Sequence, residues 1–272
     1  MASVFLDRLH QFQQQRRSLL CVGLDPEAAR LPVHLVQQYG PLEATYHFCR
    51  TVAEATEPYV CAYKFNLAFF EASGARGMDV LERLVEELRD KAIIIADAKR
   101  GDIGNTARLY AEAAFNWLGA DACTVAPYMG RDSVEPFLAF GDRAAFVLAR
   151  TSNQSSRDFQ DLQVDGEPLY RHVARRVAEW DRSARGQAGL VVGATDIAAI
   201  GEIRSLCPDL PFLIPGVGAQ GGEPSEVLRA GRTREGTIIV NSSRSIIYAS
   251  SSDDFADAAA GAASELASLL YY

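Results

Sequence analysis

The sequence predicts an α/β protein of the (β/α)8 class, a TIM barrel folded as a single domain. Eight short apolar runs alternate with segments of helical length along the whole chain. The chain has 272 residues, close to the roughly 250 that such a barrel usually needs. Because no linker, low-complexity tract or repeat divides it, we expect one domain over 1–272. A doubly wound sheet is the alternative, but it usually has fewer strands at this length.

The predicted strands share one pattern, in which a short apolar run ends in glycine, proline or polar residues. They cover 18–26, 59–66, 92–99, 122–127, 144–153, 188–195, 212–218 and 237–243. Between them, apolar side chains at three- and four-residue spacing, as from Val80 to Leu88, predict amphipathic helices. Two further helices are expected to pack on the barrel, at about 3–16 and at about 254–270.

The longest connection, 154–187, joins the fifth and sixth predicted strands. Its first residues are polar, and a helical pattern begins at about Glu167. Long loops at the mouth of a barrel usually have a function. The polar part is therefore predicted to be a mobile loop over the site.

Composition argues against several classes of protein. The net charge of −8 disfavours nonspecific binding of nucleic acid, which needs a basic surface. We expect no membrane partner, because no apolar run approaches the ~18–20 residues of a membrane span and the first residues lack an apolar signal core. The five cysteines are scattered without a C-x-x-C motif, which predicts reduced thiols in a cytoplasmic protein. Since no His, Cys or Glu cluster has ligand spacing, we expect no metal and no organic cofactor.

Charged residues concentrate at the end of the third predicted strand, in the run Asp97-Ala98-Lys99-Arg100-Gly101-Asp102. Side chains alternate along a strand, so Asp97 and Lys99 are expected to project to the same side. Gly101 then ends the strand, and a helix is predicted from near Asn105. Charge at the end of a buried strand is costly unless it is paired or used. A solvated turn would also explain these residues.

Polar residues follow most of the other predicted strands too, and the active sites of barrels lie at these strand ends. After the seventh strand, Gly216, Gly218 and Gly221 match the dinucleotide fingerprint GxGxxG. The motif does not open a βαβ unit, so we reject that interpretation. Loops after strands seven and eight of a barrel commonly hold a phosphate. We therefore predict a phosphate site that includes Gln220 and Arg244.

The run from Asp97 to Ala107, D-A-K-R-G-D-I-G-N-T-A, resembles the signature of the orotidine 5′-phosphate decarboxylase family, in its bacterial branch with the longer chain. The resemblance extends from Leu20 to Arg244. It implies a homodimer with shared active sites that decarboxylates orotidine 5′-phosphate to UMP in pyrimidine synthesis, without a cofactor. The motif Asp-x-Lys-x-x-Asp is shared with sugar-phosphate relatives, so a Mg²⁺-dependent aldolase or keto-acid decarboxylase is an alternative. A nucleotide-binding regulator without catalytic activity is another.

The resemblance also implies the roles of individual residues. The expected catalytic residues form a network of alternating charge: Lys64, Asp97, Lys99 and Asp102. Lys99 would protonate C6 of the pyrimidine, and Asp102 would come from the other subunit, together with Ile103 and Thr106. The expected substrate contacts are Asp25 to the ribose hydroxyls, Ser152 to the pyrimidine edge, Pro215 beside the base, and Gln220 and Arg244 to the phosphate.

Overall fold

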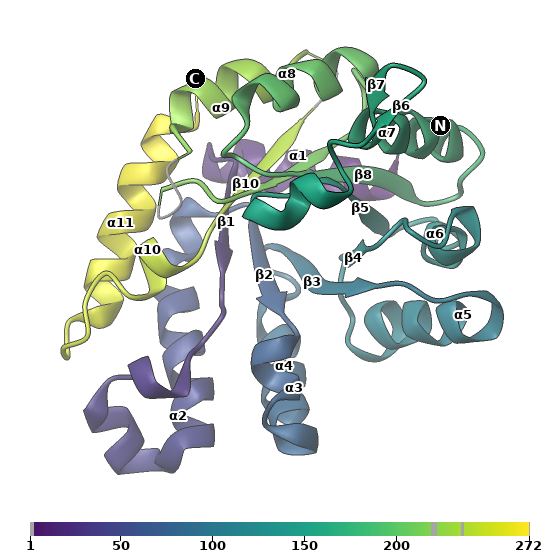
Figure 1. The fold of residues 1–272 in the computed structure, drawn as a ribbon. Helices are drawn as coiled ribbons and strands as arrows, with labels where there is room; N and C mark the ends of the chain where they lie inside the picture. Colours follow the sequence, from purple (N-terminus) through teal and green to yellow (C-terminus); the bar gives the residue numbers. More distant parts are fainter. Residues whose placement is uncertain (1–2, 219–221, 235–236, 272) are drawn as a thin grey trace.

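A closed barrel of parallel strands forms the centre of the structure (Figure 1). The computed structural model describes residues 3–218, 222–234 and 237–271. Within them the barrel has eight strands, which neighbour one another in the order β1, β10, β9, β8, β5, β4, β3, β2. They are β1 (Leu20–Gly23), β2 (Ala62–Asn66), β3 (Ile93–Arg100), β4 (Ala122–Val125), β5 (Ala144–Arg150), β8 (Gln187–Val192), β9 (Phe212–Pro215) and β10 (Ile238–Ser242). The predicted (β/α)8 barrel is confirmed.

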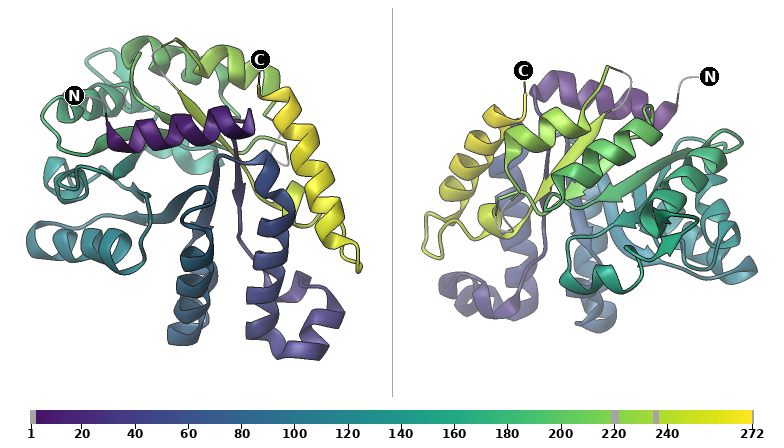
Figure 2. Two further views of the ribbon diagram at one scale, coloured as in Figure 1. Left: turned by 180° about the vertical axis from the view of Figure 1, so that it is seen from behind. Right: turned by 45° about the horizontal axis from the view of Figure 1, so that its top comes forward.

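Helices surround this barrel, and α11 lies alongside α2 in the views of Figures 1 and 2. The α-helices are α1 (Val4–Arg16), α2 (Val33–Thr56), α3 (Ala68–Glu71), α4 (Gly74–Leu88), α5 (Gly104–Glu112), α6 (Arg131–Leu138), α7 (Leu169–Asp181), α8 (Ile197–Leu206), α9 (Pro224–Gly231), α10 (Arg244–Ile247) and α11 (Phe255–Leu269). Four segments of 3-10 or π-helix complete the described helices: η1 (Ala28–Arg30), η2 (Glu57–Tyr59), η3 (Ala113–Trp117) and η4 (Gln154–Asp158). None of the helices described here combines the length and the apolar character needed to cross a bilayer.

The connection after β5 contains a small hairpin that the sequence analysis did not predict. Its strands, β6 (Gln163–Val164) and β7 (Glu167–Pro168), pair antiparallel. The two residues between them, Asp165 and Gly166, both have positive φ, of 52° and 81°. Asp-Gly is a favoured pair for such a two-residue turn, so a local signal was present. The helix that follows begins at Leu169, two residues after the predicted Glu167.

The alternation of side chains along β3 shows how the barrel divides its core. Ile93 and Ile95 belong to the apolar cluster inside the barrel, whereas Ile94 belongs to the layer between the strands and the helices. Phe5 of α1 packs against Phe146 inside the barrel, with ring centroids 6.1 Å apart. Helix α1 thus crosses one end of the barrel, as Figure 2 shows, which leaves the opposite end open for a site.

A buried carboxylate fixes α1 to the strands. Asp121, whose side chain is 3% exposed, accepts hydrogen bonds from Arg8 of α1 and from Arg143 just before β5. Its second oxygen accepts from the backbone N–H of Ile94 at 2.9 Å. One side chain therefore connects α1 to three consecutive strands of the barrel wall.

We expect Asp121→Ala to lower the free energy of unfolding by about 3 kcal/mol, because it leaves two arginines and a buried N–H without their acceptor. Urea unfolding followed by circular dichroism measures the change. Asp142→Ala is the matched control, since Asp142 is mostly exposed and lies 3.5 Å from Arg143. Equal losses in the two variants would contradict the structural role of Asp121.

Candidate active site

A cavity of about 600 Å³ opens at the carboxyl ends of the barrel strands. Its floor is apolar and includes Leu148, Val191 and Leu213. Its rim is polar and carries acidic and basic groups from several strand ends, among them Asp25, Lys64, Asp97, Lys99 and Arg244. The site therefore combines an apolar surface for a flat ring with fixed charges around it.

Two lysines hold the carboxylate of Asp97 between them. Lys64 Nζ donates to Asp97 Oδ2 at 2.9 Å, and Lys99 Nζ donates to Asp97 Oδ1 at 2.6 Å. The side chains of Lys64 and Asp97 are 5% and 10% exposed, whereas Lys99 is about half exposed. Lys99 is thus the ammonium group of this pair that a molecule in the cavity could reach.

Asp25 extends the array on the other side of Lys64. Its Oδ1 lies 3.7 Å from Lys64 Nζ and accepts a hydrogen bond from the N–H of Asn66 at 3.1 Å. Its Oδ2 accepts from the hydroxyl of Ser243 at 2.9 Å. Asp25 therefore stands between the ends of β2 and β10, in a fixed orientation at the cavity wall.

Thr124 is a member of this network that the sequence analysis did not identify. Its hydroxyl donates to Asp97 Oδ1 at 2.8 Å and accepts from the backbone N–H of Lys99 at 3.0 Å. A hydroxyl in an otherwise apolar strand was the only sequence signal, and it does not say which residue Thr124 contacts. The contact fixes both the carboxylate and the backbone that carries Lys99.

The backbone of Lys99 is unusual. Its φ is 49°, in the left-handed region, and the pairing of β3 with β4 shifts register between Ala96 and Arg100. Residues other than glycine are uncommon in this region, because the conformation costs them about 1–2 kcal/mol. Asp97 and Lys99 both face the cavity, as the alternation predicted, but a bulge and not a regular pleat places Lys99.

The charges of this array stabilise one another. Burial by itself lowers the pKa of Lys64, but the carboxylates of Asp25 and Asp97 outweigh it and raise that pKa above its ordinary value. Burial by itself raises the pKa of Asp97, but Lys64 and Lys99 outweigh it and hold that pKa well below its usual range. Lys64 and Asp97 are therefore both charged at neutral pH.

The remaining residues expected at the site fall into three groups. Ser152, Pro215 and Arg244 line the cavity. Gln220 lies outside the described residues. The expected contributions of a second subunit, Asp102, Ile103 and Thr106, do not line the cavity of their own chain.

The outward position of that last group is visible in its surroundings. Asp102 Oδ1 accepts from the N–H of Ile103 at 2.8 Å, and Ile103 is 51% exposed. Both precede α5, beyond the end of β3. The structure thus separates Asp102 from Lys64, Asp97 and Lys99 within one chain.

Of the phosphate site predicted after β9 and β10, the structure describes Arg244 and the glycines near it. Gly216 and Gly218 have φ of 97° and 83°, values that other residues rarely adopt. Arg244, the first residue of α10, is exposed and has no carboxylate partner among the described residues. An anion in this part of the cavity would therefore meet an uncommitted guanidinium.

Comparisons with known proteins identify the family of this chain. Residues 18–259 match the family model described as Orotidine 5′-phosphate decarboxylase / HUMPS family. The chain belongs to this family. Proteins named orotidine 5′-phosphate decarboxylase from Azoarcus sp. (strain BH72) and Ralstonia pickettii (strain 12J) are each 49% identical to it. The alignments cover 95% of both chains for the first, and 94% of this chain and 93% of the relative for the second.

Solved structures of two similar proteins share the fold. The OMP decarboxylase of Leishmania donovani is 38% identical, with a TM-score of 0.82 and 99% of each chain covered. The UMP synthase of Leishmania donovani is 39% identical, with a TM-score of 0.84, over 99% of this chain and 57% of that one. The barrel described here thus has the same fold as the OMP decarboxylase structure and as the matched part of the UMP synthase structure.

Stability should depend on pH through Asp97. Because its folded-state pKa is depressed, its ionised form stabilises the fold at neutral pH, and this contribution is lost as pH falls below the unfolded value of about 3.9. We expect Asp97→Asn to lower the free energy of unfolding at pH 7. The difference from the parent chain should shrink as the pH is lowered from about 5 to 2.

Urea unfolding at a series of pH values measures this difference. Asp79→Asn is the control, because Asp79 is exposed on α4 and has no ion-pair partner among the described residues. A difference between Asp97→Asn and the parent that stays constant over this range would contradict the proposed coupling.

Proposed function

We propose that this chain decarboxylates orotidine 5′-phosphate to UMP in pyrimidine synthesis, as a carboxy-lyase. The proposal rests on the family, on relatives of that name at 49% identity, and on one observation in the cavity. That observation is the pair of ammonium groups, Lys64 and Lys99, hydrogen-bonded to the single carboxylate of Asp97. Lys99 lines the cavity and is the most exposed of these three residues.

The reaction places a demand that this array can meet. The bond from C6 to the carboxylate breaks, its electron pair stays on C6, and carbon dioxide leaves. The resulting carbanion lies in the plane of the ring, where no adjacent π system delocalises it well. A fixed positive charge close to C6 is then the main means of stabilising it. We assign this role to Lys99, whose ammonium then gives its proton to C6 and regains one from solvent.

Asp97 and Lys64 support Lys99 before the substrate arrives. Asp97 accepts hydrogen bonds from both lysines and from Thr124, so its position is over-determined. A polar array that is already oriented needs little reorganisation when charge develops, which is the source of most electrostatic catalysis. In our proposal Asp97 also lies near the substrate carboxylate, so its negative charge favours departure of carbon dioxide.

The other cavity residues suit the rest of the nucleotide. We assign the ribose hydroxyls to Asp25, the pyrimidine edge to Ser152, and one face of the base to Pro215. Arg244 would bind the phosphate as an uncommitted guanidinium, with Gln220 as its predicted companion. Binding energy at this remote phosphate would help to order the site for the reaction.

The two alternatives fit this geometry less well. A Mg²⁺-dependent sugar-phosphate enzyme needs carboxylate oxygens for its metal, but both oxygens of Asp97 already accept from an ammonium. Among the described residues, no group of three or more His, Cys, Asp or Glu side chains is placed to hold a metal ion. A regulator that only binds nucleotide would not need an ammonium group at Lys99, whose left-handed backbone is strained.

We also infer a cytoplasmic location. All five cysteines are free and buried, and burial raises the pKa of thiols such as Cys207, to about 11. Unpaired cysteines in this number are typical of a reducing compartment. Neither a nucleic acid nor a membrane is proposed as a partner.

Loss of absorbance by orotidine 5′-phosphate tests the proposed reaction. We expect turnover by the parent chain, unchanged by EDTA, and a loss on the order of 10³-fold or more in Lys99→Ala. Arg244→Ala should lower kcat/KM. The activation free energy should rise by on the order of 2–5 kcal/mol, because a desolvated charge contact is removed. With orotidine, which lacks the phosphate, Arg244→Ala should react as fast as the parent.

Two results would contradict these assignments. Turnover that EDTA abolishes and Mg²⁺ restores would favour the sugar-phosphate class of reaction. Equal damage by Arg244→Ala with the phosphorylated and the phosphate-free substrate would show that Arg244 does not act through the phosphate.

We further propose a homodimer in which Asp102 completes the site of the other subunit. Ile103, Leu109 and Tyr110 are large apolar side chains exposed around α5, next to Asp102. A two-fold axis makes any such contribution reciprocal. Ile103 and Thr106 would then also meet the substrate bound to the partner chain.

Mixing two inactive variants tests this arrangement. Lys99→Ala and Asp102→Ala should each be nearly inactive as homodimers. After they are dissociated and reassociated together, about half of the dimers are mixed, and each mixed dimer has one intact site. Roughly a quarter of the parent activity should return. If exchange of subunits is demonstrated and the mixture stays inactive, Asp102 serves its own chain.

A further inference from the structure

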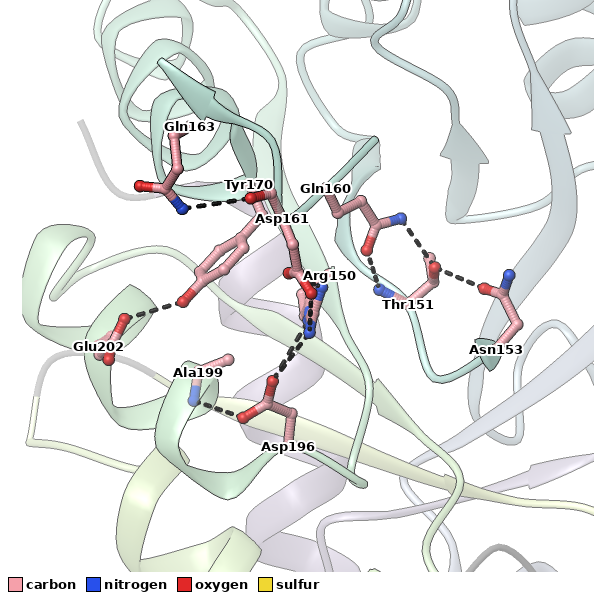
Figure 3. Close-up of polar contacts among 10 residues, drawn as sticks. All are labelled: Arg150, Thr151, Asn153, Gln160, Asp161, Gln163, Tyr170, Asp196, Ala199 and Glu202. Atoms are coloured by element: carbon pink, nitrogen blue, oxygen red, sulfur yellow. Dashed lines mark hydrogen bonds and ion pairs between the residues drawn. The ribbon is translucent and has the colours of Figure 1, made fainter. Parts of the chain in front are cut away.

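The segment after β5 supplies part of the cavity wall, and a single glutamine closes it into a loop (Figure 3). Gln160 Oε1 accepts from the backbone N–H of Thr151 at 2.9 Å. Gln160 Nε2 donates to the hydroxyl of Thr151 at 2.8 Å. Both ends of one side-chain amide thus hold one residue, directly beside Ser152.

These hydrogen bonds have a direction. The hydroxyl of Thr151 accepts from Gln160, so its own proton is available for Asn153 Oδ1, which lies 2.7 Å away. The relay therefore runs from Gln160 through Thr151 to Asn153 (Figure 3). This relay turns the amide oxygen of Asn153 toward Thr151, so the amide nitrogen of Asn153 points away from Thr151.

A buried arginine holds the far end of the same loop. Arg150, with a side chain that is 10% exposed, donates to Asp161 at 2.5 Å and to Asp196 at 3.2 Å. Asp196 is itself fixed, because its Oδ1 accepts from the N–H of Ala199 at the start of α8. Residues 151–161 are therefore tied at both ends to the barrel.

The backbone at Ser152 is also held from behind. A Cβ atom at Gly193 would lie 2.9 Å from the backbone nitrogen of Ser152 and 3.1 Å from its Cβ. Only glycine permits this approach without a shift. Gln160 and Gly193 thus act on the same short stretch of backbone.

We propose that Gln160 is a positioning residue for the pyrimidine end of the substrate, and that it acts through Thr151. This inference rests on the proposed function. Gln160 borders the cavity, but its amide oxygen and nitrogen both already bond to Thr151. Its effect on the base is therefore to hold the 151–153 wall in one conformation before binding, which lowers the ordering cost of binding.

Two ligands that differ only at the base separate this role from general destabilisation. UMP carries phosphate, ribose and base, whereas ribose 5-phosphate carries no base. In Gln160→Ala we expect the Kd for UMP and the KM for orotidine 5′-phosphate to rise about tenfold, as expected when one or two hydrogen bonds are lost. The Kd for ribose 5-phosphate should stay within about twofold of the parent value. The kcat should stay within about threefold.

A matched control and a second variant make the test specific. Gln154→Ala removes the same side chain from the same loop, at an exposed position that does not line the cavity. It should leave all four constants unchanged. Thr151→Val keeps the backbone N–H that Gln160 accepts from but removes the hydroxyl. It should therefore raise the Kd for UMP by a smaller factor than Gln160→Ala does. The double variant should be no worse than Gln160→Ala alone, because both changes break one relay.

The outcomes are distinguishable. Three outcomes would overturn the role of Gln160. Binding of UMP and of ribose 5-phosphate could weaken equally, binding of neither could weaken, or the effects of the two substitutions could add in the double variant. If Gln160→Ala fails to fold, Thr151→Val decides the same question by the same pair of ligands. Failure of the parent chain to turn over orotidine 5′-phosphate, with normal binding of UMP, would instead overturn the proposed function.

Discussion

The site depends on one buried carboxylate held between two ammonium groups. Asp97 meets Lys64 on one oxygen and Lys99 on the other, in a cavity where any of the three charges alone would be costly. The pKa shifts of Lys64 and Asp97 run against the effect of burial, because Asp25 and Asp97 act on Lys64 and both lysines act on Asp97. The barrel supplies what this arrangement requires, namely rigid neighbouring strands that end at one mouth.

The register of the barrel explains how residues far apart in sequence meet. Strands β1, β2 and β3 are neighbours, with Lys64 opposite Gly23 and Asn66 opposite Asp97. Because parallel strands place their carboxyl ends at one edge, Asp25 lies within reach of Lys64 without any special loop. The chemistry is thus assembled from strand ends, while the α1 end of the barrel contributes stability.

Much of this could be predicted from the sequence, for physical reasons. Each buried strand leaves a short apolar run in the sequence, so all eight barrel strands were found, with ends that differ by a few residues. The hairpin of β6 and β7 was missed because two-residue strands produce no periodicity. Thr124 was missed because its contact joins residues 27 positions apart, and no local pattern encodes such a contact. The contribution of Asp102 stays a prediction, since it depends on a second chain.

The left-handed backbone at Lys99 has a consequence for how this protein evolves. Glycine would occupy that conformation without strain, so mutation toward glycine relaxes the backbone and removes the ammonium group in the same step. The relief of backbone strain is opposed by the loss of the ion pair that helps to keep the buried Asp97 charged, so glycine here would remove both the ammonium group and part of the support of Asp97. Only a descendant that has also lost Asp97 would be free of this structural reason to keep lysine, so the two positions are expected to change together.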